Sequence, residues 1–235
     1  MAGDVSLGVW ALLGEPRTAA ALEHAGFDWV LLDQQHGHFD DRAVRETFEH
    51  RGTPRVPMLV RPRANAADLI GRALDDGADG VVVPLVDGAD QAEAAVAATR
   101  YPPRGGRSYG PLPHLEPAPD APAPFVGVMV ETAAGLADVD AIARTPDLDL
   151  VLVGPFDLSL SLGTTVDELL ADDAPDAPLR RVIAACRAAG VRAGAFGATE
   201  PRARRLVELG FDFVVAALDT SVLAAGGDIA TRVRA

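Results

Sequence analysis

The sequence predicts an eight-stranded (β/α)₈ barrel, and a recurring phrase is the first observation that predicts it. The phrase consists of glycine, any residue and aspartate, followed by an apolar run. It occurs in full at Ala25–Asp33, Asp76–Val86 and Leu209–Asp219, and as a variant at Thr145–Asp157. Such a phrase is typical of a helix that ends at glycine, a short turn and a strand buried on both faces. Four further apolar runs bring the expected strands to eight, and the chain length of 235 residues approaches the ~250 of a typical barrel.

Strands and helices alternate in the first half of the chain. Apolar runs and the first two complete phrases predict strands within Leu7–Leu12, Ala25–Asp33, Val56–Val60 and Asp76–Val86. Apolar residues at helical spacing predict helices over Ala66–Leu74 and Ala89–Ala98. Proline and glycine are dense in Tyr101–Pro124, which therefore predicts a loop.

The same alternation continues in the second half. The expected strands lie within Phe125–Val130, Thr145–Asp157, Val191–Phe196 and Leu209–Asp219, and the expected helices are Leu136–Ile142 and Ala203–Leu209. The acidic segment Asp167–Pro178 contains two prolines and predicts a second loop. An open, doubly wound sheet is the competing architecture, but it uses fewer strands at this length, and no G-x-G-x-x-G turn follows any strand here.

Composition and charge limit the classes of function. With 49% apolar residues, the chain can bury a substantial core, and we expect one domain over residues 1–235. A net charge of −13 disfavours nucleic acid and membrane surfaces, so small molecules or other proteins are the expected partners. The lone Cys186 predicts a core residue in a reducing compartment, and the absence of a leader-like or spanning apolar segment predicts a cytoplasmic location.

Two carboxylates are expected at the carboxyl ends of neighbouring strands, where the side chains of a barrel converge on one mouth. Glu131 follows the fifth expected strand and Asp157 the sixth, without histidine or cysteine beside them. Such oxygen ligands suit Mg²⁺ or Mn²⁺ better than zinc. The alternative is that Glu131 caps the next helix and Asp157 pairs with an arginine.

A cation and a base are expected at the same mouth. Arg61 ends the third expected strand, where its fork of donors suits a substrate carboxylate, with an ion pair across strand ends as the alternative. His36 lies in the turn after the second strand, and Asp33 stands three residues earlier. A carboxylate there can fix the tautomer of the imidazole, so the two residues predict a general acid/base pair.

Five motifs, in order, carry a resemblance to a known family. The segments LLDQQHG, LVRP, VPLVDGADQAEAAVAATRYPPRGGR, VMVETAAGL and VLVGPFDLSLSLG resemble the HpcH/HpaI family of metal-dependent pyruvate aldolases, which contains 4-hydroxy-2-oxoheptanedioate aldolase. The resemblance runs from about Leu7 to Leu223. It implies a (β/α)₈ barrel of the phosphoenolpyruvate/pyruvate-domain type and a lyase that cleaves a 4-hydroxy-2-oxo acid to pyruvate and an aldehyde.

The resemblance also implies roles for individual residues. Glu131 and Asp157 would hold the divalent metal, Mg²⁺ or Mn²⁺ with Co²⁺ or Zn²⁺ as alternatives, and Arg61 would stabilise the enolate. His36, assisted by Asp33, would be the base, and the backbone of Gly154, Pro155 and Phe156 would face the pyruvate carboxylate. Two positions depart from the family pattern, because Gln35 stands where members have glutamate and Met129 where glutamine is common. These departures affect the tuning of the base and the acceptor preference.

Assembly is implied by the same resemblance. Asp75 occupies the position of an acid that reaches the histidine of a neighbouring subunit in a hexamer, a trimer of dimers. The local alternative is that Asp75 and Asp76 form a solvated helix end before Gly77.

Other reactions remain open from the residues alone. The chain contains no lysine, so an aldol reaction cannot proceed through a Schiff base and requires a metal. Another metal-dependent oxo-acid lyase or decarboxylase would use the same enolate site. A phosphosugar isomerase is disfavoured because the seventh and eighth strands end in AFGATE and AALDTS rather than in a glycine-rich phosphate cradle. A barrel with a purely binding role is the remaining class.

Overall fold

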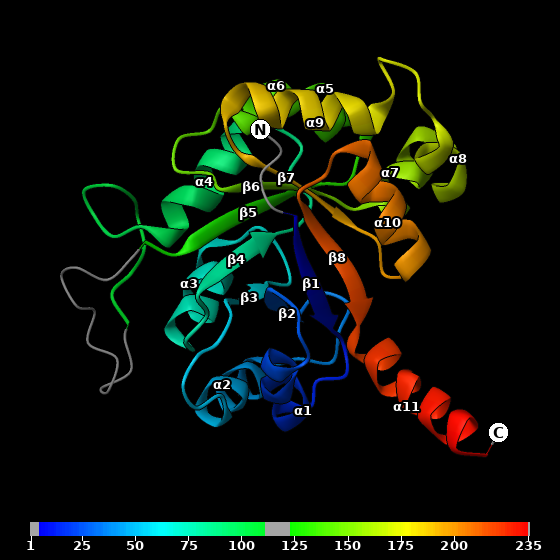
Figure 1. Ribbon diagram of the computed structural model, residues 1–235. Coiled ribbons are helices and arrows are strands. Elements are labelled where there is room, and N and C mark those ends of the chain that lie inside the picture. Colours follow the sequence, from blue (N-terminus) through cyan, green and yellow to red (C-terminus); the bar gives the residue numbers. More distant parts are fainter. Residues whose placement is uncertain (1–4, 111–122, 235) are drawn as a thin grey trace.

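Eight parallel strands close into a barrel in the computed structural model, which describes residues 5–110 and 123–234 (Figure 1). Each strand pairs with the next along the chain, and β8 pairs with β1. The predicted barrel is therefore confirmed. The strands are β1 Ser6–Ala11, β2 Trp29–Asp33, β3 Met58–Arg61, β4 Gly80–Val83, β5 Phe125–Val130, β6 Leu150–Val153, β7 Arg192–Phe196 and β8 Phe213–Leu218.

Helices follow the strands and form an outer layer. They are α1 Pro16–Ala21, η1 Leu22–His24, α2 Asp41–His50, α3 Ala67–Asp75, α4 Ala89–Thr99, α5 Ala133–Ala137, α6 Val139–Ala143, α7 Pro155–Leu162, α8 Val166–Ala171, α9 Pro178–Ala189, α10 Glu200–Leu209 and α11 Asp219–Arg234. No described helix is both long and apolar enough to cross a membrane.

Two predictions of local structure were wrong. The expected helix Leu136–Ile142 is divided between α5 and α6 at Asp138, whose carboxylate accepts a hydrogen bond from the N–H of Ala89 at 2.9 Å. The expected loop Asp167–Pro178 contains most of α8, because Thr165 and Glu168 form a reciprocal capping box that starts this helix. In Tyr101–Pro124 the described residues carry no helix or strand, as predicted, and residues 111–122 lie outside the described part.

The aspartate of the recurring phrase ties neighbouring strands together at their amino ends. In two complete copies and in the variant, its carboxylate accepts a hydrogen bond of 2.8 Å from a backbone N–H of the preceding strand. Its own N–H donates to the carbonyl of the same residue. The pairs are Asp28 with Leu7, Asp79 with Met58, and Asp149 with Val126. The repeat therefore stabilises the face opposite the expected site.

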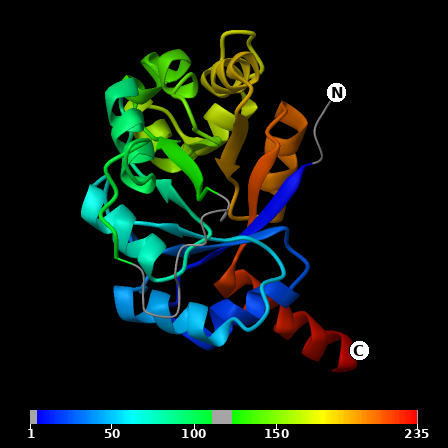
Figure 2. The same ribbon diagram turned by 90° about the vertical axis from the view of Figure 1, so that its left-hand side faces the viewer.

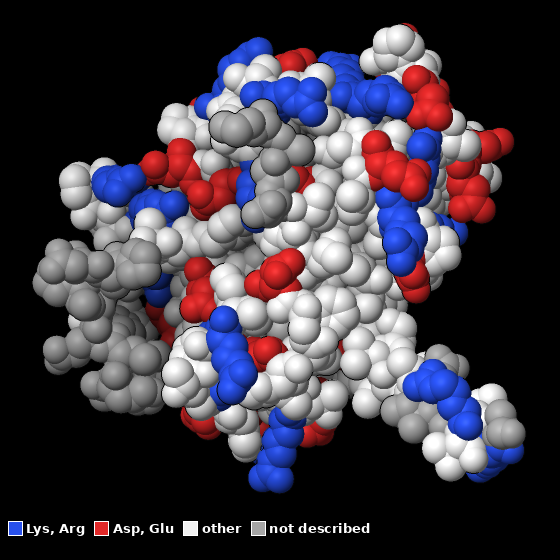
Figure 3. Space-filling view, in the orientation of Figure 1, with Lys and Arg blue, Asp and Glu red and all other residues white. Residues whose placement is uncertain are grey.

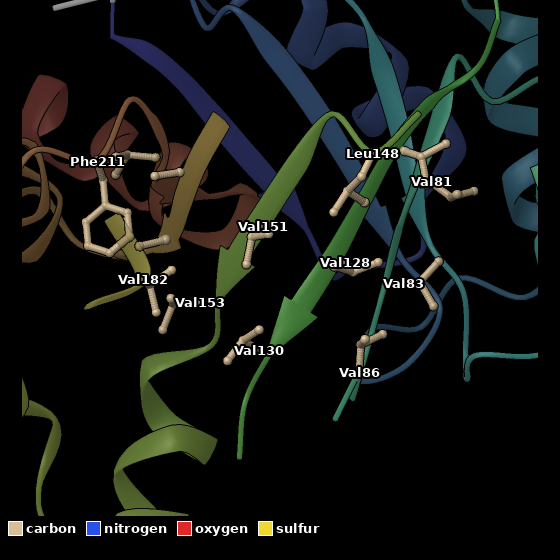
Figure 4. Packing of buried hydrophobic residues seen from close by; sticks show 14 of the residues in the cluster. Val81, Val83, Val86, Val128, Val130, Leu148, Val151, Val153, Val182 and Phe211 are labelled. Carbon is tan, nitrogen blue, oxygen red and sulfur yellow. The ribbon is translucent and has the colours of Figure 1, made fainter. Parts of the chain in front are cut away.

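Buried side chains fill the barrel and a second layer surrounds it. Inside, the ring of Trp29 stacks on Phe213 with centroids 4.1 Å apart. Gly8 makes room for this stack, because a Cβ there would lie 2.1 Å from the Trp29 ring. Between strands and helices, valines of β4, β5 and β6 pack outward (Figure 4). Cys186 lies in this outer layer, where burial raises the pKa of its thiol to about 12, and the predicted core role is confirmed.

Candidate active site

The candidate residues lie at the carboxyl end of the barrel, where β2, β3, β5 and β6 finish. Asp33 is the last residue of β2 and Arg61 the last of β3, and the register pairs them directly. Glu131 follows β5 without an intervening residue, and Asp157 is the third residue of α7, which starts one residue after β6. The barrel interior below them is filled by side chains, so the site is at the mouth.

Arg61 and Asp33 form a buried, two-point ion pair. The Nε atom of Arg61 donates to Oδ1 of Asp33 at 2.9 Å, and Nη2 donates to Oδ2 at 2.6 Å. The Trp10 indole N–H donates to the same Oδ2 at 3.2 Å, and its ring lies 4.9 Å from the guanidinium carbon. The ion pair raised as the alternative for Arg61 is therefore present.

The pair leaves part of the Arg61 fork free for a ligand. Its Nη1 atom forms no hydrogen bond with Asp33 among the described residues, and its one side-chain acceptor there is the Met129 sulfur, at a long 3.8 Å in the barrel interior. Asp33 thus holds the guanidinium in one orientation, with Nη1 beside Met129. Burial opposes ionisation of Asp33, but the hydrogen bonds and charge of Arg61 outweigh it and lower the pKa of this carboxyl.

Glu131 is a buried carboxylate held by an unusual backbone. Its Oε2 atom accepts a hydrogen bond from the N–H of Leu85 at 2.9 Å. Leu85 has a φ of 55°, a left-handed conformation that leucine rarely adopts and that costs of order 1–3 kcal/mol. Gly154 completes the enclosure, since a Cβ there would lie 2.6 Å from Oε1 of Glu131.

The electrostatics of Glu131 suit a divalent cation. Burial raises the pKa of Glu131, the Leu85 N–H and the charge of Arg61 oppose this, and the negative charges of Asp157 and Asp33 add to it. A bound cation would offset both the burial and the repulsion. The alternative of a helix cap is wrong for Glu131, because Thr132 caps α5 by accepting from the Gly135 N–H at 3.0 Å.

Asp157 is exposed and forms no ion pair within residues 5–110 and 123–234, so its predicted alternative partner is absent there. The described residues contain no group of three metal-binding side chains. Two carboxylates and open positions are consistent with a cation that keeps water and substrate as further ligands. Glu131 and Asp157 therefore fit Mg²⁺ or Mn²⁺.

The turn that carries His36 is ordered differently from the prediction. Oδ1 of Asp33 accepts hydrogen bonds from the backbone N–H groups of Gln35 at 2.9 Å and of His36 at 3.3 Å. Both oxygens of Asp33 are therefore engaged, and neither bonds the imidazole of His36, which is exposed. The predicted Asp33–His36 side-chain pair is replaced by a backbone clamp, because Arg61 and the turn N–H groups occupy both oxygens of Asp33.

The first turn of α7 presents backbone to the mouth. Pro155 has no N–H, and the intrahelical bonds begin with Leu158 donating to Gly154. The N–H groups of Phe156 and Asp157 therefore have no acceptor within the helix. Such groups suit a carboxylate ligand. The Phe156 ring packs edge-on against Phe196, with centroids 6.1 Å apart.

Asp75 lies at the end of α3, near the opposite face, and has a partner in its own chain. Its Oδ1 atom lies 2.6 Å from Nη2 of Arg107. Asp76 is buried and pairs with Arg45 at 2.9 Å. The solvated helix end considered above is therefore wrong.

Comparisons with known proteins identify the family. The model of the HpcH/HpaI aldolase/citrate lyase family matches residues 6–225. The chain belongs to this family. A hydroxypyruvate/pyruvate aldolase of Pseudomonas aeruginosa is 36% identical over 94% of this chain and 85% of that protein. A 4-hydroxy-2-oxo-heptane-1,7-dioate aldolase of Salmonella paratyphi C is 34% identical over 97% of this chain and 89% of that protein.

A solved structure of the same family shares the fold. The HpcH/HpaI aldolase/citrate lyase family protein from Burkholderia cenocepacia J2315 superposes with a TM-score of 0.84 and 32% identity. The match covers 99% of this chain and 95% of that one. The resemblance drawn from the five sequence motifs is confirmed.

Two residues of this site, Trp10 and Leu85, were not predicted from the sequence. Trp10 of β1 donates a hydrogen bond to Asp33 and packs against the guanidinium of Arg61. The sequence feature that could have indicated this role is an aromatic residue on the inward face of a strand. Leu85 holds Glu131 through its backbone N–H, for which the side chain gives no signal.

Proposed function

We propose that this HpcH/HpaI family member is a divalent-metal-dependent aldolase, a carbon–carbon lyase. It reversibly cleaves a 4-hydroxy-2-oxo acid to pyruvate, or a close 2-oxo acid, and an aldehyde. The observation that carries the proposal is the Glu131–Asp157 carboxylate pair beside the clamped fork of Arg61 at the barrel mouth. The names of the two aldolase relatives support the same reaction class.

Each residue has a role that its geometry supports. Glu131 and Asp157 would hold Mg²⁺ or Mn²⁺, with Co²⁺ or Zn²⁺ as substitutes, and the bound ion would supply Lewis-acid chemistry to the oxo acid. Arg61 directs Nη1 toward the oxo acid, and Asp33 with Trp10 keeps it there. The backbone of Gly154, Pro155 and Phe156 faces the carboxylate, which would accept a hydrogen bond from the free N–H of Phe156 in the first turn of α7.

His36 and Gln35 complete the proposed chemistry on the aldehyde side. The exposed His36 imidazole removes the proton from the C4 hydroxyl, after which the C3–C4 bond breaks and the aldehyde leaves. Gln35, which replaces the glutamate of the family pattern, lines the substrate site. Its Oε1 atom is buried and has no hydrogen-bond partner in the described part of the chain. A substrate hydroxyl can satisfy that acceptor.

Pyruvate alone is sufficient to test the reaction class. In D₂O, the methyl protons of pyruvate should exchange when Mg²⁺ or Mn²⁺ is present, because the site stabilises the enolate without an aldehyde. NMR follows the loss of the methyl signal, and a chelator should stop it. Exchange that continues undiminished after rigorous metal removal contradicts the proposal. Analysis of cleavage products then separates an aldolase from a decarboxylase.

We propose further that the enzyme is a cytoplasmic, single-domain homo-oligomer, a hexamer, in which Asp75 of one subunit orients His36 of another. Asp75→Asn should lower turnover with little loss of metal affinity, and mixing it with His36→Ala should restore activity at sites that receive both intact residues. Turnover of the mixture against each parent measures the rescue. Arg107→Gln is the matched control, because it breaks the Asp75 ion pair within the chain but keeps the carboxylate. A lack of rescue after verified subunit exchange rules out the shared site.

A further inference from the structure

The connection between β4 and α4 carries a leucine in a conformation that favours glycine. Leu85 has a φ of 55°, in the left-handed region, where a leucine side chain is rare. The other non-glycine residues with a positive φ in the described part of the chain, Asp147 and Ala198, have smaller side chains. A bulky residue persists in this region only where its surroundings impose the strain, and such residues cluster at functional sites.

The hydrogen bonds of this turn explain the conformation but not the leucine. The N–H of Leu85 donates to Oε2 of Glu131, directly after β5. The next N–H, that of Val86, donates to the carbonyl of Met129 in β5 at 3.0 Å. In a regular strand successive N–H groups point to opposite neighbours, so this double donation toward β5 requires a kinked residue. Glycine would provide the same two bonds without the strain.

Packing does not account for the leucine either. Pro84 and Val86 on each side are buried, whereas Leu85 is 49% exposed. Single apolar residues among the charged side chains of a surface are ordinary (Figure 3), so exposure by itself carries no inference. The combination requires an explanation, because the side chain lies largely outside the core and its backbone would be less strained with glycine.

Leu85 stands at the mouth of the barrel, beside a proposed metal ligand. It lies in the connection from β4 to α4, and α4 packs next to α3 on the outside of the barrel (Figures 1 and 2). Its N–H is 2.9 Å from Oε2 of Glu131. Standard bond lengths then place the Cβ atom of Leu85 within about 6 Å of that oxygen. A substrate held at Glu131 is therefore within reach of the leucine side chain.

We propose that Leu85 determines acceptor specificity. Its side chain packs against the carbon chain of the aldehyde, which is the part of the substrate beyond C4. The leucine favours an aldehyde with a hydrocarbon chain over one with a hydroxyl group beside the carbonyl, because burying an unpaired hydroxyl against it costs free energy. The strain at Leu85 is then retained for this contact. The inference rests on the proposed aldolase reaction.

Two aldehydes test the contact in a ratio that cancels other defects. The enzyme with Mg²⁺ and pyruvate is given butanal or glycolaldehyde, and kcat/KM of aldol addition is measured for each. Both additions use the same metal and enolate, so a change in how Glu131 is held affects both alike. Leu85→Ala should lower the ratio of butanal to glycolaldehyde by roughly 10-fold, the scale of one lost apolar contact. Leu85→Met keeps an apolar side chain of similar volume and should retain the ratio.

A second leucine and a glycine variant complete the design. Leu7 is 38% exposed at the amino end of the barrel, so Leu7→Ala is the matched control and should leave the ratio unchanged. Leu85→Gly should lose the same selectivity as Leu85→Ala. The glycine variant should also unfold at a higher urea concentration than the alanine variant, by roughly 0.3 M, because only alanine pays for the positive φ.

The outcomes separate this inference from the reaction on which it rests. A ratio that stays the same in Leu85→Ala and Leu85→Gly would overturn the acceptor contact, as would an equal fall in Leu7→Ala. A glycine variant no more stable than the alanine variant would overturn the strain that motivates it. A parent enzyme that exchanges no methyl protons of pyruvate would instead overturn the proposed function, and this inference with it.

Discussion

Glu131→Gln is expected to abolish metal-dependent turnover. The amide keeps the size of the side chain and can still accept from the Leu85 N–H, but it removes one of two anionic oxygen ligands. We expect kcat to fall by roughly 1000-fold or more, the scale of losing several kcal/mol of Lewis-acid stabilisation. Thermal unfolding with and without Mg²⁺ or Mn²⁺ supplies the second readout. Metal at about 100 times its Kd should stabilise the parent by roughly 2.7 kcal/mol and the variant by far less.

Glu23→Gln is the matched control for this change. Glu23 is also a buried glutamate, but it pairs with Arg51 at 2.5 Å, remote from the mouth. Its replacement removes one of the two carboxylates that pair with the buried Arg51 and leaves only Asp79, so stability should fall while the metal response stays. Asp157→Asn should behave like Glu131→Gln. Unchanged metal affinity in both ligand variants would show that the metal binds elsewhere.

Arg61→Lys is expected to cost roughly 100-fold to 1000-fold in kcat/KM although it conserves the positive charge. An ammonium group cannot bond both oxygens of Asp33 and also present a fixed donor to the oxo acid. Pyruvate proton exchange measures the effect. Arg51→Lys is the control, since this arginine also binds buried carboxylate but lies away from the mouth. Near-normal exchange by Arg61→Lys would leave Arg61 with a structural role only.

The stability of Arg61→Met should depend on pH in a defined direction. Arg61 holds the pKa of Asp33 below its ordinary value, so the pair stabilises the fold above the ordinary pKa of aspartate. That stabilisation is lost as the pH falls through the lowered pKa. Urea unfolding should therefore show a deficit of about 3–5 kcal/mol for Arg61→Met near pH 7 that shrinks in acid. A deficit that does not change with pH would contradict this origin.

Much of the fold could be predicted because its signals are local. The phrase with glycine and aspartate marks helix-to-strand junctions, and the structure shows why, since Asp28, Asp79 and Asp149 each bond the preceding strand. The signal for the start of α8, which was not predicted, is also local, because Thr165 and Glu168 form a capping box within four residues. The division between α5 and α6 at Asp138 has no such local signal, because the Asp138 carboxylate bonds the N–H of Ala89, 49 residues away.

The sequence by itself determined the barrel, the family and the residues that end its strands, since strand period, turn residues and motif order are written along the chain. Only the tertiary structure decided which side chains meet. It joined Asp33 to Arg61 rather than to the His36 ring, and Asp75 to Arg107. These choices depend on distances between segments remote in sequence and on competition among donors for one buried carboxylate, which no local pattern encodes.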